Sequence, residues 1–110
     1  MSFSIEDHAG TKVVYLHGEM VGANPALVEA VTNLLTAPGV RVVISMADVP
    51  FMNSTGLADL VRLTAQANVQ EGQVILTDLS PFVAGVLQTT QLIRFFETAA
   101  TVDEALSSRP

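Results

Sequence analysis

The sequence of 110 residues contains no cysteine, which excludes disulfide bonds and metal sites built from thiolates. Basic residues are scarce, because five lysines and arginines stand against eleven aspartates and glutamates, for a formal net charge of -6. This balance argues against nucleic acid or an anionic membrane as a partner and is compatible with a basic protein. No apolar run approaches the ~20 residues of a membrane span, and the first ten residues lack signal-peptide features. We therefore expect a cytoplasmic protein with no direct membrane insertion.

The composition is that of a folded domain. Apolar residues make up 49% of the chain and charged residues only 15%, which excludes disorder. The length fits a single domain spanning residues 1–110. A mean hydropathy of +0.44 indicates a well-filled core and is compatible with an apolar surface that meets a partner.

Strand and helix patterns alternate along the chain. Residues 12–18 show the two-residue period of a strand, and residues 40–46 form the almost continuous apolar run of a strand buried on both faces. The first helix has Asn24 as a cap and Pro25 at its first position. The full set of predicted elements comprises strands at 3–5, 12–18, 40–46, 74–79 and 93–98, and helices at 22–39, 56–70, 80–92 and 101–109.

The order of these elements, ββαβαβαβα, predicts the fold class. A hairpin comes first, and the later strands are separated by helices, which favours parallel pairing with right-handed crossovers. We expect an α/β domain with a small mixed, mostly parallel sheet and helices packed against it. In the predicted second helix, Leu57 and Leu60 belong to the apolar face, while Asp59, Arg62 and Gln66 point away.

Catalytic constellations are not evident. The histidines, His8 and His17, have no neighbouring residues that suggest a catalytic triad. No phosphate-binding GxxxxGK[ST] loop, GxGxxG motif or metal-ligand spacing occurs. The expectation is therefore a protein that is not an enzyme and needs no cofactor or metal.

The polar cluster Asn53, Ser54 and Thr55 precedes Gly56 at the start of the second predicted helix. Helix capping explains one of these residues, and three in succession are more than one helix end requires. The alternative is a hydroxyl placed for modification. A phosphate on Ser54 would add about -1.5 to -2 charges beside the positive end of the helix dipole, which tolerates it. A partner that buries the neutral hydroxyl would be repelled by the dianion.

The chain resembles a STAS domain, specifically the stand-alone bacterial anti-sigma-factor antagonists. "VVYLHGEM" resembles the second strand of that family, and "VRVVISMADVPFMNSTGLADLVRL" resembles its signature of a buried strand, a D-S-(S/T)-G loop and a helix. "GQVILTDLSPFVAGVLQTTQLIRFFETAATVDEAL" resembles the remaining strand–helix–strand–helix. Two positions depart from the family pattern: Asn53 stands where an acid usually precedes the serine, and Val21 stands where an acid often follows the second strand.

The resemblance implies that Ser54 is the phosphorylation site, with Thr55 as the alternative acceptor. It implies an anti-sigma factor with serine-kinase activity as the partner, a phosphatase that reverses the modification, and ATP bound by the partner alone. Unmodified protein would bind the kinase and release the sigma factor. The expected contact surface consists of Met52, Asn53, Ser54, Thr55 and Gly56, joined by Glu19 and Met20; Met52 is expected at the surface because a connection offers little burial.

Two other functions remain open. One is a constitutive scaffold subunit, of a lipid-asymmetry ABC transporter or of a stress-signalling assembly, since Asn53 and Val21 depart from the switch pattern. The other is a small enzyme or ligand-binding domain with a flavodoxin-like outline. The identity of a co-purifying partner, or a bound small molecule, distinguishes these cases.

Overall fold

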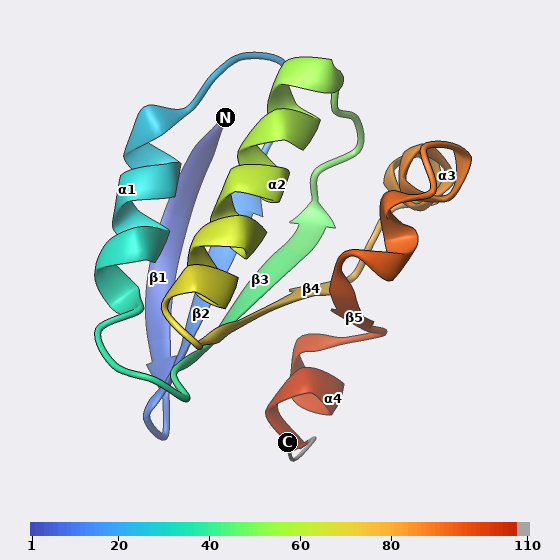
Figure 1. Ribbon diagram of the computed structural model, residues 1–110. Helices are drawn as coiled ribbons and strands as arrows, with labels where there is room; N and C mark the ends of the chain where they lie inside the picture. Colours follow the sequence, from blue (N-terminus) through green and yellow to red (C-terminus); the bar gives the residue numbers. More distant parts are fainter. Residues whose placement is uncertain (108–110) are drawn as a thin grey trace.

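A computed structural model describes residues 1–107 of the chain. Five strands form one mixed sheet in the order β1-β2-β3-β4-β5 (Figure 1). β1 is antiparallel to β2, and every later neighbour is parallel, which confirms the predicted fold class. The elements are β1 (Ser2–His8), β2 (Thr11–His17), α1 (Pro25–Leu34), β3 (Arg41–Asp48), α2 (Ser54–Val69), β4 (Gln73–Thr77), α3 (Pro81–Thr89), the 3-10 turn η1 (Leu92–Arg94), β5 (Glu97–Ala99) and α4 (Val102–Ser107).

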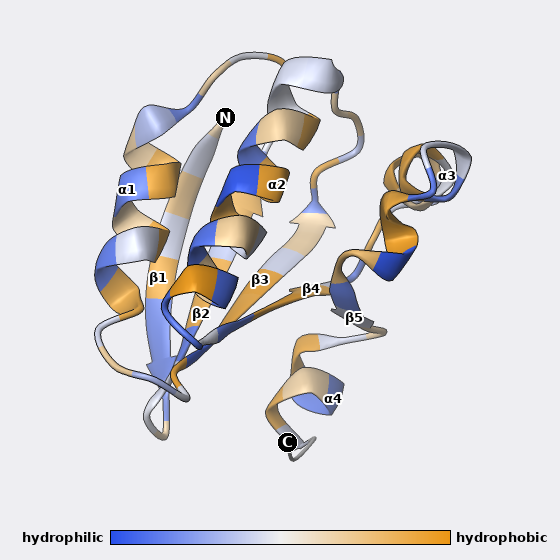
Figure 2. Cartoon of the chain, in the orientation of Figure 1, coloured by the Kyte–Doolittle hydropathy of each residue, from blue (hydrophilic) through white to orange (hydrophobic). Residues whose placement is uncertain are grey.

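The two faces of the sheet carry two separate apolar clusters because successive side chains of a strand point to opposite faces. On one face, α1 and α2 lie side by side and cover Val14, Ile44 and Leu76 (Figure 1). On the other, Val13 and Val43 pack with Ala105 of the short helix α4. Figure 2 shows that α1 and α2 each carry both apolar and hydrophilic residues, as is typical of helices that cover one face of a sheet. The alternation predicted within β2 is therefore confirmed.

Predicted caps begin the helices. The Asn24 side chain accepts a hydrogen bond from the Leu27 amide at the start of α1. Ser80 Oγ accepts one from the Val83 amide at the start of α3. Thr101 Oγ1 accepts the Glu104 amide at 3.1 Å and begins α4. Each satisfies an amide that has no intrahelical acceptor. The last two residues of the helix predicted at 101–109 lie outside the described residues.

The final strand differs from its prediction at 93–98. Ile93 and Arg94 belong to the 3-10 turn η1, and β5 begins only at Glu97. β5 pairs with Ile75–Thr77, the last residues of the short strand β4. Phe96, which is 6% exposed, enters the main core just before that pairing begins. Ile93 and Phe96 are thus used for packing in the crossover rather than for pairing, while Phe95 is 40% exposed.

The β1–β2 hairpin turns at Ala9 and Gly10, whose φ angles of 55° and 94° match the right-handed twist of the strands. The Asp7 carboxylate accepts hydrogen bonds from the Gly10 amide at 2.8 Å and from Lys12 Nζ at 2.9 Å. The hydrogen bond from Lys12, followed by that from Gly10, lowers the pKa of Asp7 below its usual 3.8.

Acidification is expected to loosen this hairpin before the rest of the fold. Because the folded-state pKa of Asp7 is depressed, its contribution to stability is present above pH 3.8 and disappears as pH falls through the lower folded pKa. An NMR titration should place the Asp7 midpoint below 3.8, accompanied by loss of Gly10 amide protection. In Lys12→Met the midpoint should move back up; an unchanged midpoint in that variant would contradict this assignment.

Candidate functional site

The polar cluster singled out in the sequence lies at the start of α2, where Asn53 is the helix cap. The side-chain oxygen of Asn53 accepts hydrogen bonds from the Thr55 and Gly56 amides, each at 3.1 Å. Ser54 is the first residue of the helix. One asparagine oxygen therefore satisfies two of the free amides at this helix end, and the hydroxyls of Ser54 and Thr55 are not needed for capping.

Ser54 and Thr55 are both exposed. Within residues 1–107, neither hydroxyl has a hydrogen-bond partner, in contrast to Ser80 and Thr101, which cap their own helices. The Ser54 oxygen is thus open to solvent at the positive end of a helix of 16 residues. Geometry and charge at this point are compatible with a hydroxyl that is modified and read by another protein.

The connection that follows β2 runs alongside the connection that follows β3. The Gly18 amide donates to the Asp48 carbonyl at 2.9 Å, the Met20 amide donates to Phe51 at 3.0 Å, and the Asn53 amide donates back to Met20 at 3.1 Å. Met20 and Met52 form an isolated parallel β-bridge. These bonds extend the β2–β3 pairing beyond the sheet and hold the loop before Ser54 against its neighbour.

Gly56 allows α2 to approach this connection closely. A Cβ at Gly56 would lie 2.2 Å from the Met20 carbonyl oxygen and 2.7 Å from Met20 Cβ. The contact is with backbone, which cannot rotate away. Gly56 is itself buried, so its role is to admit the Met20 backbone rather than to face a partner.

The expectation that Met52 is exposed is wrong. Met52 and Met20 are each 2% exposed, and both belong to the main core. The bridge between them continues the β2–β3 pairing, and each of the two connections buries its methionine in the core. Of the predicted contact residues, Glu19, Asn53, Ser54 and Thr55 are exposed.

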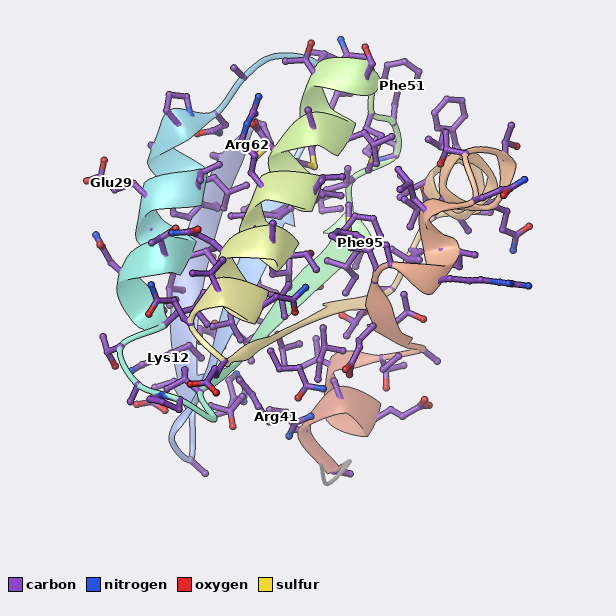
Figure 3. The ribbon with its side chains drawn as sticks, in the orientation of Figure 1. Lys12, Glu29, Arg41, Phe51, Arg62 and Phe95 are labelled. Carbon is purple, nitrogen blue, oxygen red and sulfur yellow. The ribbon has the colours of Figure 1, made fainter. Side chains whose placement is uncertain are left out.

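Asp59 differs most from its prediction. It was expected to point away from the core, but it is only 2% exposed. Its Oδ2 accepts a hydrogen bond from the Asn24 amide, and its Oδ1 accepts one from Arg62, each at 2.7 Å. Arg62 lies on the side of α2 that faces α1 (Figure 3). The carboxylate therefore fixes the start of α1 to α2, a role that no periodicity in the sequence indicates.

Exposed apolar side chains flank the Ser54 region. Val21 is 49% exposed on the β2–α1 connection, and Phe82 is 47% exposed on α3. The ring of Phe51 lies 4.8 Å, between centroids, from that of Phe82, and Figure 3 shows Phe51 on the side of its loop that faces α3. Phe82 was not among the predicted contact residues. Its position after Pro81, outside the apolar stripe of α3, is the sequence signal that could have identified it.

His17 lies between Ser4 and Asp48 on the surface. Its Nδ1 is 3.2 Å from Asp48 Oδ2, and its Nε2 is 3.5 Å from Ser4 Oγ. The side chains of His17 and Asp48 are 45% and 74% exposed. Water competes for both contacts, and 3.5 Å is long for a hydrogen bond.

Among residues 1–107, no group of three or more histidine, aspartate or glutamate side chains is placed to hold a metal ion. In the same part of the chain, none of the helices combines the length and the apolar character that crossing a membrane requires.

The chain belongs to the STAS-domain family, whose model matches residues 2–105. The fold and the Asn-Ser-Thr-Gly helix start agree with that assignment. An anti-sigma factor antagonist from Mycobacterium paratuberculosis is 27% identical, with a TM-score of 0.77 over 96% of this chain and 91% of that one. A putative anti-sigma factor antagonist from Thermotoga maritima is 17% identical, with a TM-score of 0.77 over 94% of this chain and 91% of that one.

The fold is shared more widely. The anti-sigma factor antagonist SpoIIAA in its unphosphorylated form superposes with a TM-score of 0.61 at 18% identity, covering 96% of this chain and 94% of that one. A sulfate transporter family protein from Wolinella succinogenes gives 0.72 at 16% identity, over 91% of this chain and 84% of that one. At these identities the likeness concerns the fold alone.

Proposed function

We propose that this protein is an anti-sigma-factor antagonist that binds an anti-sigma factor with serine-kinase activity and is released when Ser54 is phosphorylated. The observation that carries the proposal is the exposed, unpartnered Ser54 hydroxyl at the first residue of α2, beside a cap already provided by Asn53. Family membership and the likeness to antagonists support the same assignment. Catalysis belongs to the kinase and to a phosphatase that restores the hydroxyl.

The switch follows from the arrangement of charge around Ser54. Asn53 already occupies the Thr55 and Gly56 amides, so a phosphate on Ser54 gains no ready set of backbone donors there. Of the four lysines and arginines in residues 1–107, Arg62 is two helical turns away and paired with Asp59, and Lys12 is paired with Asp7. Arg41 bonds to Gln73 and Ala105 at the first residue of β3, the end opposite to the start of α2, and Arg94 lies on η1 after α3. The phosphate would remain a free dianion on the surface, and a partner that buries this position would have to desolvate it at a cost of several kcal/mol.

The first test is phosphorylation and capture in parallel. Wild-type protein should capture a serine kinase from the native host, and the kinase with ATP should modify Ser54. Ser54→Ala should abolish this modification and retain binding, while Ser54→Asp should weaken binding at least 30-fold, because an unpaired charge in an interface costs about 2 kcal/mol or more. Thr55→Ala, in the same assay, distinguishes the two candidate hydroxyls.

Thr36→Asp is the charge control, because Thr36 is exposed beyond the far end of α1. This variant should bind the kinase as wild type does. Full phosphorylation of Ser54→Ala would exclude Ser54 as the acceptor, and loss of phosphorylation in Thr55→Ala would then assign the modification to Thr55. Stable capture of an ABC-type ATPase, unaffected by Ser54→Asp, would instead establish the scaffold function that the neutral residues Asn53 and Val21 leave open.

A further inference from the structure

Asn53 makes one hydrogen bond that helix capping does not require. While its side-chain oxygen accepts the Thr55 and Gly56 amides, its side-chain nitrogen Nδ2 donates to the Val21 carbonyl at 2.9 Å. A single carboxamide therefore caps α2 on one side and holds the β2–α1 connection on the other. The main-chain amide of Asn53 adds a third tie, to the Met20 carbonyl at 3.1 Å.

Only a side chain with both a donor and an acceptor can make these contacts together. An aspartate would cap α2 equally well, but its carboxylate has no hydrogen to donate and would face the Val21 carbonyl oxygen. Serine and threonine are shorter, and their single hydroxyl cannot cap the helix and reach Val21 at once. The asparagine at this position is thus more than an uncharged substitute for an acid.

The bond to Val21 is one of four points at which the connection between β2 and α1 is held, and the first is the Gly18 amide, which donates to the Asp48 carbonyl. Met20 is fixed by its bridge to Met52. Asn24 is fixed through its amide, which donates to the buried Asp59 carboxylate at 2.7 Å. Val21 lies between these two points. Within residues 1–107, no side chain of α2 forms a hydrogen bond with the next two residues, Gly22 and Ala23. Asn53 therefore fixes the part of the connection that carries the exposed Val21 side chain.

We propose that Asn53 is a positioning residue: its amide group locks the Val21 segment against the start of α2, so that the side chains of Val21 and Ser54 form one rigid surface. The role in holding the connection stands independently, whereas its consequence for partner recognition rests on the proposed function. A rigid connection lowers the ordering cost that binding would otherwise incur. A partner would then recognise the neutral, partly apolar surface formed by Val21 and Ser54, rather than an acidic residue directly before the serine.

The test compares Asn53→Asp with wild type by amide hydrogen exchange. The aspartate should preserve the cap, so exchange within α2 and the thermal midpoint should stay close to wild type. The reporters are the hydrogen-bonded amides on either side of Val21, those of Met20 and Asn24. Their exchange should accelerate by about two- to tenfold, because a single hydrogen bond that holds this segment is lost. Asn53→Ser gives a second variant that keeps a cap oxygen, adds no charge and should show the same acceleration. Asn33→Asp, an exposed position on α1, controls for the added charge and should leave this segment unchanged.

Unchanged exchange of the Met20 and Asn24 amides in both Asn53 variants would overturn the positioning role. If exchange accelerates as expected, the affinity of both variants for the kinase captured by wild-type protein should fall by a similar factor, and an undiminished affinity would overturn the role in recognition. These outcomes are separate from those of the Ser54 variants, because failure of the proposed function leaves the exchange measurement unaffected.

Discussion

Replacing Gly56 by alanine should destabilise the protein by roughly 3 kcal/mol, the opposite of what this exchange usually does within a helix. A glycine-to-alanine change in a helix normally stabilises by about 0.5–1 kcal/mol. Here the new Cβ would lie 2.2 Å from the Met20 carbonyl oxygen, so α2 must move away from the connection that precedes α1. That movement would also pull apart the Met20–Met52 bridge.

Chemical and thermal unfolding measure this effect. The thermal midpoint of Gly56→Ala should fall by on the order of 10–20 °C. Gly85→Ala is the matched control, since Gly85 lies within α3 and a Cβ there meets nothing within 4 Å. The control should be as stable as wild type or slightly more stable. Equal stability of Gly56→Ala and Gly85→Ala would show that the close approach of α2 to Met20 is not a constraint on this fold.

Asp59→Ala should cost about 2–3 kcal/mol of unfolding free energy. The substitution leaves the Asn24 amide without its acceptor at the start of α1, and an unsatisfied buried donor costs about 1–3 kcal/mol. The hydrogen bond from Arg62 is lost as well, but Arg62 is 61% exposed and is rehydrated by water. Removing the carboxylate also removes the free-energy cost of burying its charge, and this limits the total loss of stability in Asp59→Ala.

Denaturant titrations of a small series separate these contributions. Asp59→Asn keeps an oxygen for the Asn24 amide and loses the ion pair, so it should cost only about 1 kcal/mol. Asp48→Ala removes a carboxylate that contacts His17 at the surface, where the His17 side chain is 45% exposed and that of Asp48 is 74% exposed. It should change stability by less than about 0.5 kcal/mol. A loss for Asp59→Ala no greater than that for Asp48→Ala would contradict the role of Asp59 as the tie between α1 and α2.

Gly56 and Asp59 act on the same region from two sides. Gly56 admits the Met20 backbone at the start of α2, and Asp59 holds the Asn24 amide one turn later. Together with Asn53, they position the β2–α1 connection beside Ser54. The region around the proposed phosphorylation site is therefore built to stay in place, so a phosphate on Ser54 would change the charge of the surface rather than the fold beneath it.

Local patterns were enough to predict the elements and the caps. The alternation in β2, the apolar run of β3, and the caps Asn24 and Ser80 each depend on neighbours close in sequence, and each is confirmed. The prediction of the last strand was wrong at its start: Ile93 and Phe96 have the right propensity for pairing, but Ile93 belongs to the 3-10 turn and Phe96 to the core. Pairing with β4 begins only at Glu97. Propensity carries no information about which partner strand is within reach.

The sequence by itself determined the mixed α/β architecture and the exposed hydroxyl at a helix start, because hydrophobic period, capping and turn chemistry act over a few residues. Only the tertiary structure decided that Met20 and Met52 are buried, that Asp59 faces inward, and that the Asn53 amide reaches Val21. Those outcomes depend on which two connections lie side by side beyond the parallel strands β2 and β3. Residues some 30 positions apart in the sequence meet there. The helical or strand period within one segment does not reveal which distant segment lies next to it.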